Sequence, residues 1–498
     1  MASESRMNIF LKALSKTVSD IKCHTLKPEQ QECIRRLIYC GEDVLAVLPT
    51  GFGKSLVYQL LPTVYQNLHL LETGVMKHFM IVVVSPLEYI RQQQVANVAK
   101  TMCGVRAAAI GESEENDKEI SEGKYNIVYG GAEQWLNNRW KKCLQYGGLH
   151  QSKVLVVDEV HTIETWGIGK KGKAAFREAF GRLSELRSFL AMHTPVLALT
   201  ATANKEMRNR LAKYLGMKRI EHIVVSPNKN NLRFTVLRAD KELHCFDWLI
   251  HLMLERKGET PFTIIFCRTV NDIVSLLTHF LMRLGTSGIY TDGEEPAHER
   301  CLLGVYYSQT PKNHKESVSS SFEGLGGNVR LVFASTSLSM GIDFPHVQYV
   351  VHYGPSRNLT SHLQEAGIGG RDGKQAFHLT IYHGRHLTAC EEDIKRAVTK
   401  SSNSCCHVSF LKDFDDQVCP LSPFHDCCNV CHKACMCNSD ASGCSQPVPI
   451  FDYLPESLGD DDQIRDVSVE ERECLYNALK EIQLSLSCQA KGGDGGNV

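Results

Sequence analysis

The sequence predicts an α/β protein with two tandem parallel-sheet domains followed by a small cysteine-rich subdomain. Two series of short apolar runs alternate with helical or loop stretches, which is typical of parallel sheets covered by helices. The first series begins at Asp43, Phe79, Tyr125, Lys153 and Pro195, and the second begins at Thr263, Val305, Arg330, Gln348 and Phe377. Nine of the 20 cysteines lie between Cys405 and Cys444, where apolar periodicity is weak.

These landmarks predict the domain boundaries. At 498 residues and 43% hydrophobic content, the chain is long enough for two or three ordinary domains. The expected segments are an N-terminal extension (1–23), a first domain (24–217), a second domain (218–400) whose start, 218–241, is a transition, a cysteine-rich subdomain (401–444), and a final segment (445–498) with a linker, an acidic stretch, a helix over 467–486 and a disordered tail.

Composition and charge indicate the protein's surroundings. A net charge of −1 and a pI near 7 give no overall basic field, so any nucleic-acid path comes from local clusters such as Gly169–Lys173, unless that cluster is a solvated loop. No apolar run approaches the ~18 residues of a membrane span, and Met1–Arg6 lacks a signal-peptide core. We expect no membrane partner, no secretion, a nuclear (if eukaryotic) or cytoplasmic location, and thiols or metal ligands rather than disulfides.

The most informative motif is a glycine-rich turn, Ala46-Val-Leu-Pro-Thr-Gly-Phe-Gly-Lys-Ser55, between a strand-like run and a helix-like run. Such a turn directs backbone N–H groups and a helix N-terminus at a phosphate, while its lysine contacts the β/γ-phosphates and its serine binds Mg²⁺. Leu48 replaces the usual first glycine, a form typical of helicase motors. The alternative is a turn with an incidental lysine. The predicted nucleotide ligands are Thr50, Gly51, Gly53, Lys54 and Ser55.

A second motif, Asp158-Glu159, follows the strand-like run 153–157. Because ligands of α/β sheets bind at the carboxyl ends of strands, we expect Asp158 to hold Mg²⁺ through water and Glu159 to activate the attacking water. The alternative is a pair of solvated residues at a strand end.

From about Leu26 to Cys431 the chain resembles superfamily 2 helicases, and among them the RecQ-like DNA helicases. The resemblance rests on many ordered motifs: Leu26-Lys-Pro-Glu-Gln-Gln31, Ser85-Pro-Leu87, Asp158-Glu-Val-His161, Thr162-Ile-Glu-Thr-Trp-Gly167, Thr200-Ala-Thr202, Ile264-Ile-Phe-Cys-Arg268, Ala334-Ser-Thr336 with Met340-Gly-Ile-Asp343, and Gln364-Glu365 through Gly370-Arg-Asp-Gly373. It implies two RecA-like motor domains and a zinc-binding subdomain.

The resemblance also implies roles for individual residues. Gln30 matches the glutamine that reads adenine, Asp343 matches a nucleotide contact, and Gln364 with Arg371 matches a catalytic pair in which Arg371 is the arginine finger. The matched DNA contacts are Ser85, Trp166, Arg268 and Thr336. Trp166 would couple single-strand binding to ATP hydrolysis, unless it is a core tryptophan.

Three positions depart from the family pattern. Lys27 replaces an arginine, and Gly130-Gly-Ala precedes Glu133 where Ser/Thr-Pro is usual. Ile368 replaces the first of two arginines, and two cations near the γ-phosphate would share its developing charge. We therefore expect slower hydrolysis, and a gain in rate from Ile368→Arg.

The cysteine cluster predicts structural zinc. Cys428-Asn-Val-Cys431 is a C-x2-C turn, which presents two sulfurs to one tetrahedral ion. Alignment with the family's zinc subdomain implies the ligands Cys405, Cys419, Cys428 and Cys431, with Cys427 as the main competitor. The alternative is a thiol-rich tail.

The resemblance as a whole implies an ATP-dependent 3′→5′ DNA helicase that uses ATP, Mg²⁺ and Zn²⁺, binds single-stranded and forked duplex DNA, and serves DNA repair or recombination. A DNA-stimulated translocase that unwinds weakly, and a nucleotide-dependent nucleic-acid scaffold without turnover, remain as alternatives.

Overall fold

The computed structural model describes residues 2–21, 25–169, 174–290, 300–338 and 344–435. Three predictions concern residues outside these ranges: the lysines of the basic cluster at 170–173, the nucleotide contact Asp343, and the linker, helix and tail after residue 435.

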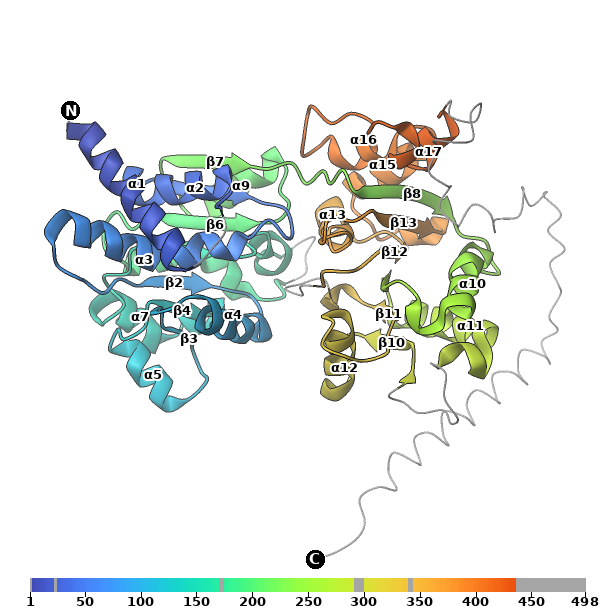
Figure 1. Cartoon of the computed structure of the whole chain (residues 1–498), viewed down its shortest axis with the longest axis horizontal. Coiled ribbons are helices and arrows are strands. Elements are labelled where there is room, and N and C mark those ends of the chain that lie inside the picture. The colour runs from blue at the N-terminus through green and yellow to red at the C-terminus, as the bar shows by residue number, and fades with distance from the viewer. Residues whose placement is uncertain (1, 22–24, 170–173, 291–299, 339–343, 436–498) are drawn as a thin grey trace, which may run out of the picture. The chain divides into compact units, whose positions relative to one another are not determined.

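The first domain contains a seven-stranded sheet in the order β3-β4-β2-β5-β6-β1-β7 (Figure 1). Every neighbouring pair in this sheet is parallel, so each connection is a crossover, and each crossover contains at least one α-helix. Its strands are β1 (Asp43–Val47), β2 (Ile81–Val84), β3 (Ala107–Ala109), β4 (Ile127–Gly130), β5 (Leu155–Val157), β6 (Val196–Thr200) and β7 (Ile220–Val224). Its helices are α1 (Ala2–Asp20), α2 (Pro28–Arg35), α3 (Lys54–Thr73), α4 (Glu88–Thr101), α5 (Glu114–Ser121), α6 (Ala132–Trp135), α7 (Asn138–Tyr146), α8 (Ser184–Phe189) and α9 (Lys205–Tyr214).

Central strands of this sheet are buried on both faces. In β1 all five residues are buried, and alternate side chains enter two different hydrophobic clusters: Leu45 and Val47 lie in one, Val44 and Ala46 in the other. This follows from the two-residue period of a strand covered by helices on both sides. The resulting rigid strand ends where the phosphate loop begins.

The second domain repeats the architecture with a six-stranded parallel sheet in the order β10-β11-β9-β12-β13-β8 (Figure 1). Its strands are β8 (Leu232–Arg238), β9 (Thr263–Cys267), β10 (Leu303–Tyr306), β11 (Leu331–Ala334), β12 (Tyr349–Tyr353) and β13 (Ala376–Tyr382). Its helices are α10 (Asp247–Arg256), α11 (Val270–Ile289), α12 (Lys312–Phe322), α13 (Leu359–Ala366), α14 (Gly384–Leu387) and α15 (Glu392–Lys400). The predicted fold class, two tandem RecA-like parallel-sheet domains, is confirmed.

All ten predicted strand runs are strands, but the transition assigned to 218–241 contains two more. β7 pairs with β1 in the first sheet, and β8 pairs with β13 in the second. The structure therefore places the boundary after Val224 rather than at 217. Both are edge strands, and the polar residues Glu221 and His222 in β7 hide its pattern. The short β3, also an edge strand, has no apolar run of its own beyond three alanines.

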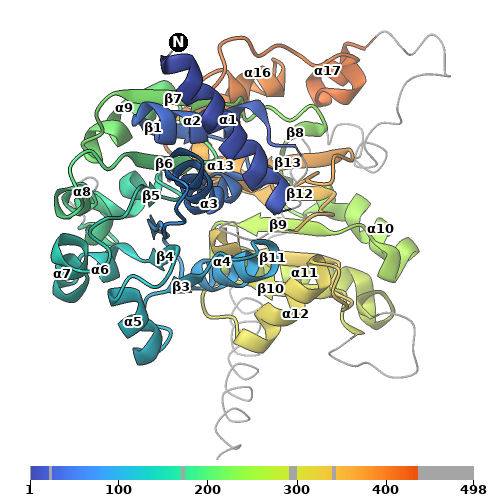
Figure 2. The ribbon, with the colours of Figure 1, turned by 60° about the vertical axis from the view of Figure 1, so that its left-hand side comes forward.

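The predicted N-terminal extension is part of the first domain. α1 packs along α3, and the two helices lie side by side in Figures 1 and 2. Phe10 and Leu14 are buried in the same hydrophobic cluster as α3, and Asn67 donates a hydrogen bond to Thr17 Oγ1 at 3.0 Å.

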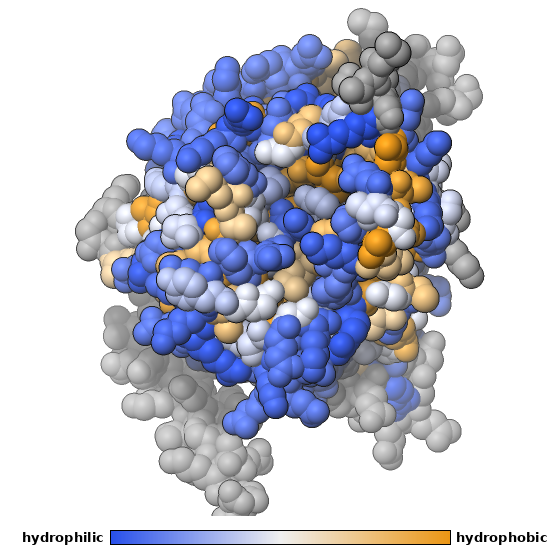
Figure 3. Space-filling model, turned by 90° about the vertical axis from the view of Figure 1, so that its left-hand side faces the viewer, coloured by the Kyte–Doolittle hydropathy of each residue, from blue (hydrophilic) through white to orange (hydrophobic). Residues whose placement is uncertain are grey.

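The cysteine-rich segment is packed on the edge of the second sheet. α16 (Cys406–Leu411) and α17 (Asn429–Lys433) contact β8, and the backbone N–H of Phe234 in β8 donates to the carbonyl of Cys427 at 3.3 Å. Hydrophilic residues dominate the face shown in Figure 3. Among the described residues we find no helix that combines the length and the apolarity needed to span a bilayer.

Candidate active site

The phosphate loop joins the end of β1 to the start of α3. Gly51 and Gly53 have φ of 80° and 88°, in the left-handed region that glycine adopts without strain. α3 begins at Lys54, directly after Gly53, so the loop and a helix N-terminus form one anion-binding element. The predicted phosphate ligands Thr50 and Ser55 lie in this element, in the turn and in the first turn of α3.

The structure also accounts for Leu48 in place of glycine. Its side chain is completely buried, and its backbone N–H donates to the carbonyl of Thr200 at 2.9 Å. This position therefore continues the sheet and fills the core, and the turn itself starts later, near Thr50.

Gln30, the predicted adenine reader, lies against this loop. Its Nε2 donates to the carbonyls of Phe52 and Gly53 at 3.0 and 3.1 Å, and its Oε1 accepts from the backbone N–H of Lys27 at 2.9 Å. Lys27 Nζ lies 4.0 Å from the centre of the Phe52 ring. The glutamine is thus placed where nucleotide binding and the shape of the phosphate loop can depend on each other.

Asp158 and Glu159 follow the carboxyl end of β5. The backbone N–H of Glu159 donates to Asp158 Oδ1 at 2.9 Å. Burial, and then the charge of Glu159, raises the pKa of Asp158 to about 7. Burial acts on Glu159 in the same direction, but Lys54 and a hydrogen bond from His161 outweigh it and lower the pKa of Glu159 to about 2. Lys54 therefore lies close enough to act on both carboxylates.

The donor set fits a magnesium ion. Carboxylate and hydroxyl oxygens are the hard ligands Mg²⁺ prefers, and Asp158 and Ser55 provide them. The raised pKa of Asp158 has its origin in a buried negative charge beside a second one, a situation that a divalent cation relieves.

The second domain contributes Arg371. A Cβ built on Gly51 would lie 3.8 Å from Arg371 Cγ, and one on Gly367 would lie 3.5 Å from Thr50 Oγ1. Gln364, on α13, is buried in the same motif. The predicted arginine finger and the phosphate loop therefore face each other.

Residues at the end of β6 and just after it connect the two domains. Thr202 Oγ1 donates to the carbonyl of Thr360 on α13 at 3.3 Å, and Thr200 Oγ1 lies 3.2 Å from His161 Nδ1. A path of side chains thus runs from the Asp158–His161 motif to the helix that carries Gln364.

Ile368 does not face the phosphate loop. It is 1% exposed and packs in the core of the second domain with Phe266, Leu338 and Val350. The expectation that an arginine at 368 would restore a phosphate contact is therefore wrong for this backbone, because that position points into apolar surroundings.

Comparisons with known proteins agree with this geometry. The family model described as DEAD/DEAH box helicase matches residues 27–210, and that of the helicase conserved C-terminal domain matches residues 244–373. An ATP-dependent helicase wrn-1 of Caenorhabditis elegans is 26% identical over 83% of this chain and 38% of its own length. The ATP-dependent DNA helicase RecQ of Haemophilus influenzae is 26% identical over 74% of this chain and 53% of its own length. This chain is a RecQ-like superfamily 2 helicase.

The aligned region spans about half or less of these two relatives. Among solved structures, Mss116p bound to ssRNA and AMP-PNP is similar in fold, with a TM-score of 0.56 and 18% identity over 78% of this chain and 74% of that chain.

In the aromatic loop of this RecQ-like helicase, the exposed ring is not that of the predicted residue, Trp166. Trp166 is half-buried, with its ring edge-on to Phe180 at 5.6 Å and to Phe176 at 5.9 Å. Phe176 is 76% exposed, and it lines a surface hollow with Arg357 of the second domain. Phe176 therefore offers a free aromatic face, whereas Trp166 supports it from below.

Sequence reasoning missed Phe176 and its neighbour Arg177. Arg177 Nε donates to Glu133 at 2.6 Å, and its guanidinium lies 5.3 Å from the centre of the Trp166 ring. Glu133, which follows the atypical Gly130-Gly-Ala, thus holds the aromatic loop. The Phe-Arg pair after the basic cluster was the available sequence signal.

The other predicted DNA contacts differ in exposure. Thr336 is exposed at the start of a short 3-10 helix. Ser85 is 1% exposed, which leaves its side chain away from the surface. Arg268 is half-buried and donates to the carbonyls of His386 and Ala389, so it holds the turn around α14.

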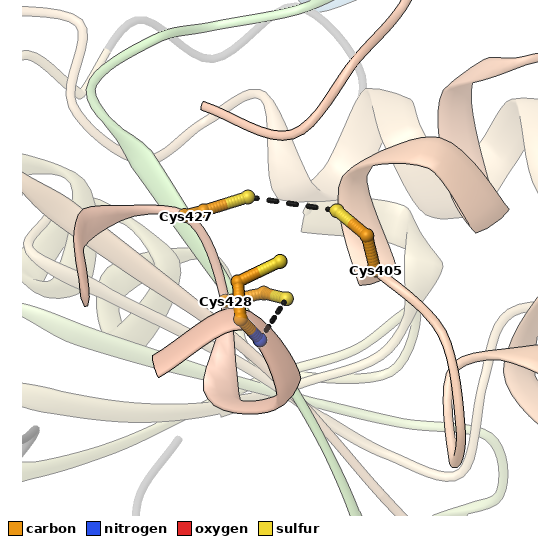
Figure 4. Close-up of side chains that lie close together, drawn as sticks. Cys405, Cys427 and Cys428 are labelled. Carbon is orange, nitrogen blue, oxygen red and sulfur yellow. Dashed lines mark hydrogen bonds between the residues drawn. The ribbon is translucent and has the colours of Figure 1, made fainter. Parts of the chain in front are cut away.

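Four thiols gather as the predicted zinc site, with one member changed (Figure 4). The sulfurs of Cys405, Cys427, Cys428 and Cys431 all lie within 4.8 Å of one another, and Cys405 Sγ is 3.5 Å from Cys427 Sγ. Cys419 is exposed and is not in this group. The competitor Cys427 replaces it, because the turn after Phe424 directs Cys427 inward.

The cluster fits a tetrahedral zinc ion. Four sulfurs at about 2.3 Å from one ion lie about 3.8 Å apart, close to the observed spacing. Hydrogen bonds from neighbouring thiols, Cys405 first, lower the pKa of Cys428, which favours the thiolate that zinc requires.

Proposed function

We propose that this RecQ-like helicase hydrolyses ATP with Mg²⁺ and uses the reaction to move 3′→5′ along single-stranded DNA and to unwind duplexes. The observation that carries the proposal is the meeting of Lys54, Glu159 and Arg371 at one phosphate loop. Two domains that close on ATP and open after hydrolysis would move their nucleic-acid surfaces in steps.

Each residue has a distinct role in this proposal. Lys54 and Arg371 stabilise the charge that develops on the γ-phosphate, and Asp158 with Ser55 would hold Mg²⁺. Glu159 orients the attacking water and takes up its proton. Gln30 senses the base, and Gln364 would act together with Arg371.

The proposed partner is DNA, single-stranded or as a forked duplex. The named RecQ relative supports DNA, while the RNA in the Mss116p structure belongs to that protein. Phe176 would stack on a base, with Trp166 behind it and Thr336 on the second domain at the backbone. A nuclear role in DNA repair or recombination is part of the proposal, and Cys405, Cys427, Cys428 and Cys431 would bind Zn²⁺ as a structural ion.

The deciding experiment measures two quantities on the purified chain. ATP hydrolysis is followed alone, with single-stranded DNA and with single-stranded RNA of the same sequence. Unwinding is followed on duplexes with a 3′ or a 5′ single-stranded tail. We expect stimulation by DNA above RNA and unwinding of the 3′-tailed duplex. Hydrolysis that is stimulated by RNA but not by DNA, or unwinding only of the 5′-tailed duplex, would contradict the proposal.

A second candidate is a DNA-stimulated translocase that unwinds weakly. The observation that favours it is the buried Ile368, which provides no second cation from the motif that carries Arg371. The same experiment separates the two, because a translocase shows DNA-stimulated hydrolysis with little strand separation.

A further inference from the structure

The segment between the two sheets contacts the turn that carries Arg371. This segment runs from the end of β7 at Val224 to the start of β8 at Leu232. Within it, Lys229 Nζ donates to the carbonyl of Gly367 at 2.6 Å and to that of Gly369 at 3.1 Å. These two carbonyls lie on either side of Ile368, the residue that replaces the family's arginine. The ammonium therefore links the two sides of the turn at this position.

Asn231 extends the same contact. Its Nδ2 donates to the carbonyl of Gly370 at 2.8 Å and to that of Lys374 at 2.7 Å. Gly370 has φ of 62°, and a Cβ there would lie 2.6 Å from Asn231 Nδ2. The turn before and after Arg371 is therefore held at four carbonyls by two side chains of the connecting segment.

The position of this turn decides where Arg371 lies. Ile368 fixes one side of it in the apolar core, and Lys229 binds the polar side, so the two residues hold it from opposite directions. Because a shift of about 1 Å in a positioned group can lower a rate about 100-fold, the contact bears on catalysis as well as on folding.

We propose that Lys229 is a positioning residue for ATP hydrolysis: its ammonium holds the glycine turn 367–370 so that Arg371 reaches the phosphate loop. The role rests on the proposed function. A charge-bearing donor suits this place, because it binds two carbonyl dipoles and keeps a second cation next to Arg371, where Ile368 provides none.

The charge of Lys229 is sensitive to pH near neutrality. Burial, and then the neighbouring positive charge of Arg371, lowers the pKa of Lys229 to about 8. The polar groups that face the ammonium are the carbonyls of Gly367 and Gly369, and Arg371 is the charged group that acts on it in the described part of the chain. As pH rises through 8 the ammonium loses its proton, and the turn loses its strongest donor.

The test compares Lys229→Met, Lys229→Arg and the wild type in DNA-stimulated ATP hydrolysis from pH 6.5 to 9.5. The pH dependence of kcat/KM reflects groups that titrate in the free enzyme. The fall of kcat/KM at high pH, its alkaline limb, therefore reports the charge of Lys229 in the absence of ATP. We expect Lys229→Met to lower kcat about tenfold or more with KM for ATP within about threefold. Lys229→Arg should keep most of kcat and lose the alkaline limb, since a guanidinium stays charged. Lys312→Met, at an exposed lysine of α12, is the matched control.

Each outcome decides the inference. A Lys229→Met variant with wild-type kcat, or the same alkaline limb in Lys229→Arg and wild type, overturns it while leaving the proposed function intact. A folded wild type that hydrolyses no ATP overturns both. If Lys229→Met fails to fold, Asn231→Ala removes the neighbouring donor, and an unchanged kcat in that variant also counts against the positioning role.

Discussion

Arg371 lies against Gly51, although the two residues belong to different domains: a Cβ on Gly51 would be 3.8 Å from Arg371 Cγ. A Cβ there would make an ordinary van der Waals contact with the aliphatic part of Arg371, so space alone does not require a glycine. The φ of 80° does require it, because an L side chain at 51 would be strained in that conformation. The glycine therefore serves the shape of the loop, and the arginine of the second domain packs directly against it.

Lys54→Ala should abolish hydrolysis, and Glu159→Gln should retain ATP binding while losing turnover. The lysine supplies charge at the phosphates, whereas the glutamine cannot take up the proton of the attacking water. We expect kcat to fall about 100-fold or more, measured by phosphate release, with binding followed by a fluorescent ATP analogue. Glu316→Gln, at an exposed position of α12, is the control. Wild-type turnover in Glu159→Gln would remove its assigned role.

Ile368→Arg should destabilise the protein rather than raise its rate of ATP hydrolysis. The new guanidinium would be placed among Phe266, Leu338 and Val350, and a buried charge without a partner lowers the free energy of unfolding by about 3–5 kcal/mol. Ile368→Val should lower it by about 1 kcal/mol. Urea unfolding of the three proteins measures the difference. A stable Ile368→Arg variant with higher kcat would show that the position opens to the cleft.

Phe176→Ala should weaken the stimulation of hydrolysis by single-stranded DNA without lowering thermal stability. The ring is mostly exposed, and base stacking on such a ring is worth about 1–3 kcal/mol. Trp166→Ala should reduce both stimulation and stability, because its ring packs on Phe180. DNA titration of the ATPase and a melting curve separate the two effects. Equal stimulation of Phe176→Ala and wild type would exclude the stacking role.

The purified chain should contain one zinc per molecule, bound through Cys427 and not through Cys419. Cys427→Ser removes a sulfur from the closed four-thiol group, so zinc content and stability should fall together. Cys419→Ser changes an exposed thiol and should alter neither. Elemental analysis of untagged protein gives the metal content. Normal zinc in Cys427→Ser, or its loss in Cys419→Ser, would restore the ligand set predicted from sequence.

Acid should destabilise the second domain through two buried histidines. Burial, and then the charge of His352, lowers the pKa of His362 and of His378 well below the ordinary value. The unfolded histidine takes up a proton below about pH 6.5 while the folded one stays neutral, so stability falls as pH falls. Because both shifts are downward, each histidine should add to a loss of stability that grows as pH falls below about 6.5.

His378→Gln should reduce this pH dependence, whatever its effect on absolute stability. The amide can keep the hydrogen bond to His352 Nδ1, which lies 2.9 Å from His378 Nε2, but it does not titrate. His193→Asn, at an exposed histidine with φ of 70°, is the control. The measurement is the urea midpoint at pH 7 and pH 5. Parallel shifts in all three proteins would exclude His378 as its source.

The sequence by itself determined the two parallel sheets and the order of the motifs along them. Strands buried on both faces carry unbroken apolar runs, and the glycine turn between Asp43–Val47 and Lys54 needs only local backbone geometry. For the same reason Asp158 and Glu159 could be placed at a strand end, and Lys54 at the start of a helix, in advance.

Only the tertiary structure decided the roles that depend on burial and on distant neighbours. Ile368 and Ser85 belong to motifs expected to contact ligands, yet both are buried. Cys427 rather than Cys419 joins the thiol group. Phe176 is exposed above Trp166. Spacing along the chain does not fix which way a side chain turns within a loop. Lys229 meets the carbonyls beside Ile368 although 138 positions separate it from Gly367, and such a contact exists only once the second domain has folded.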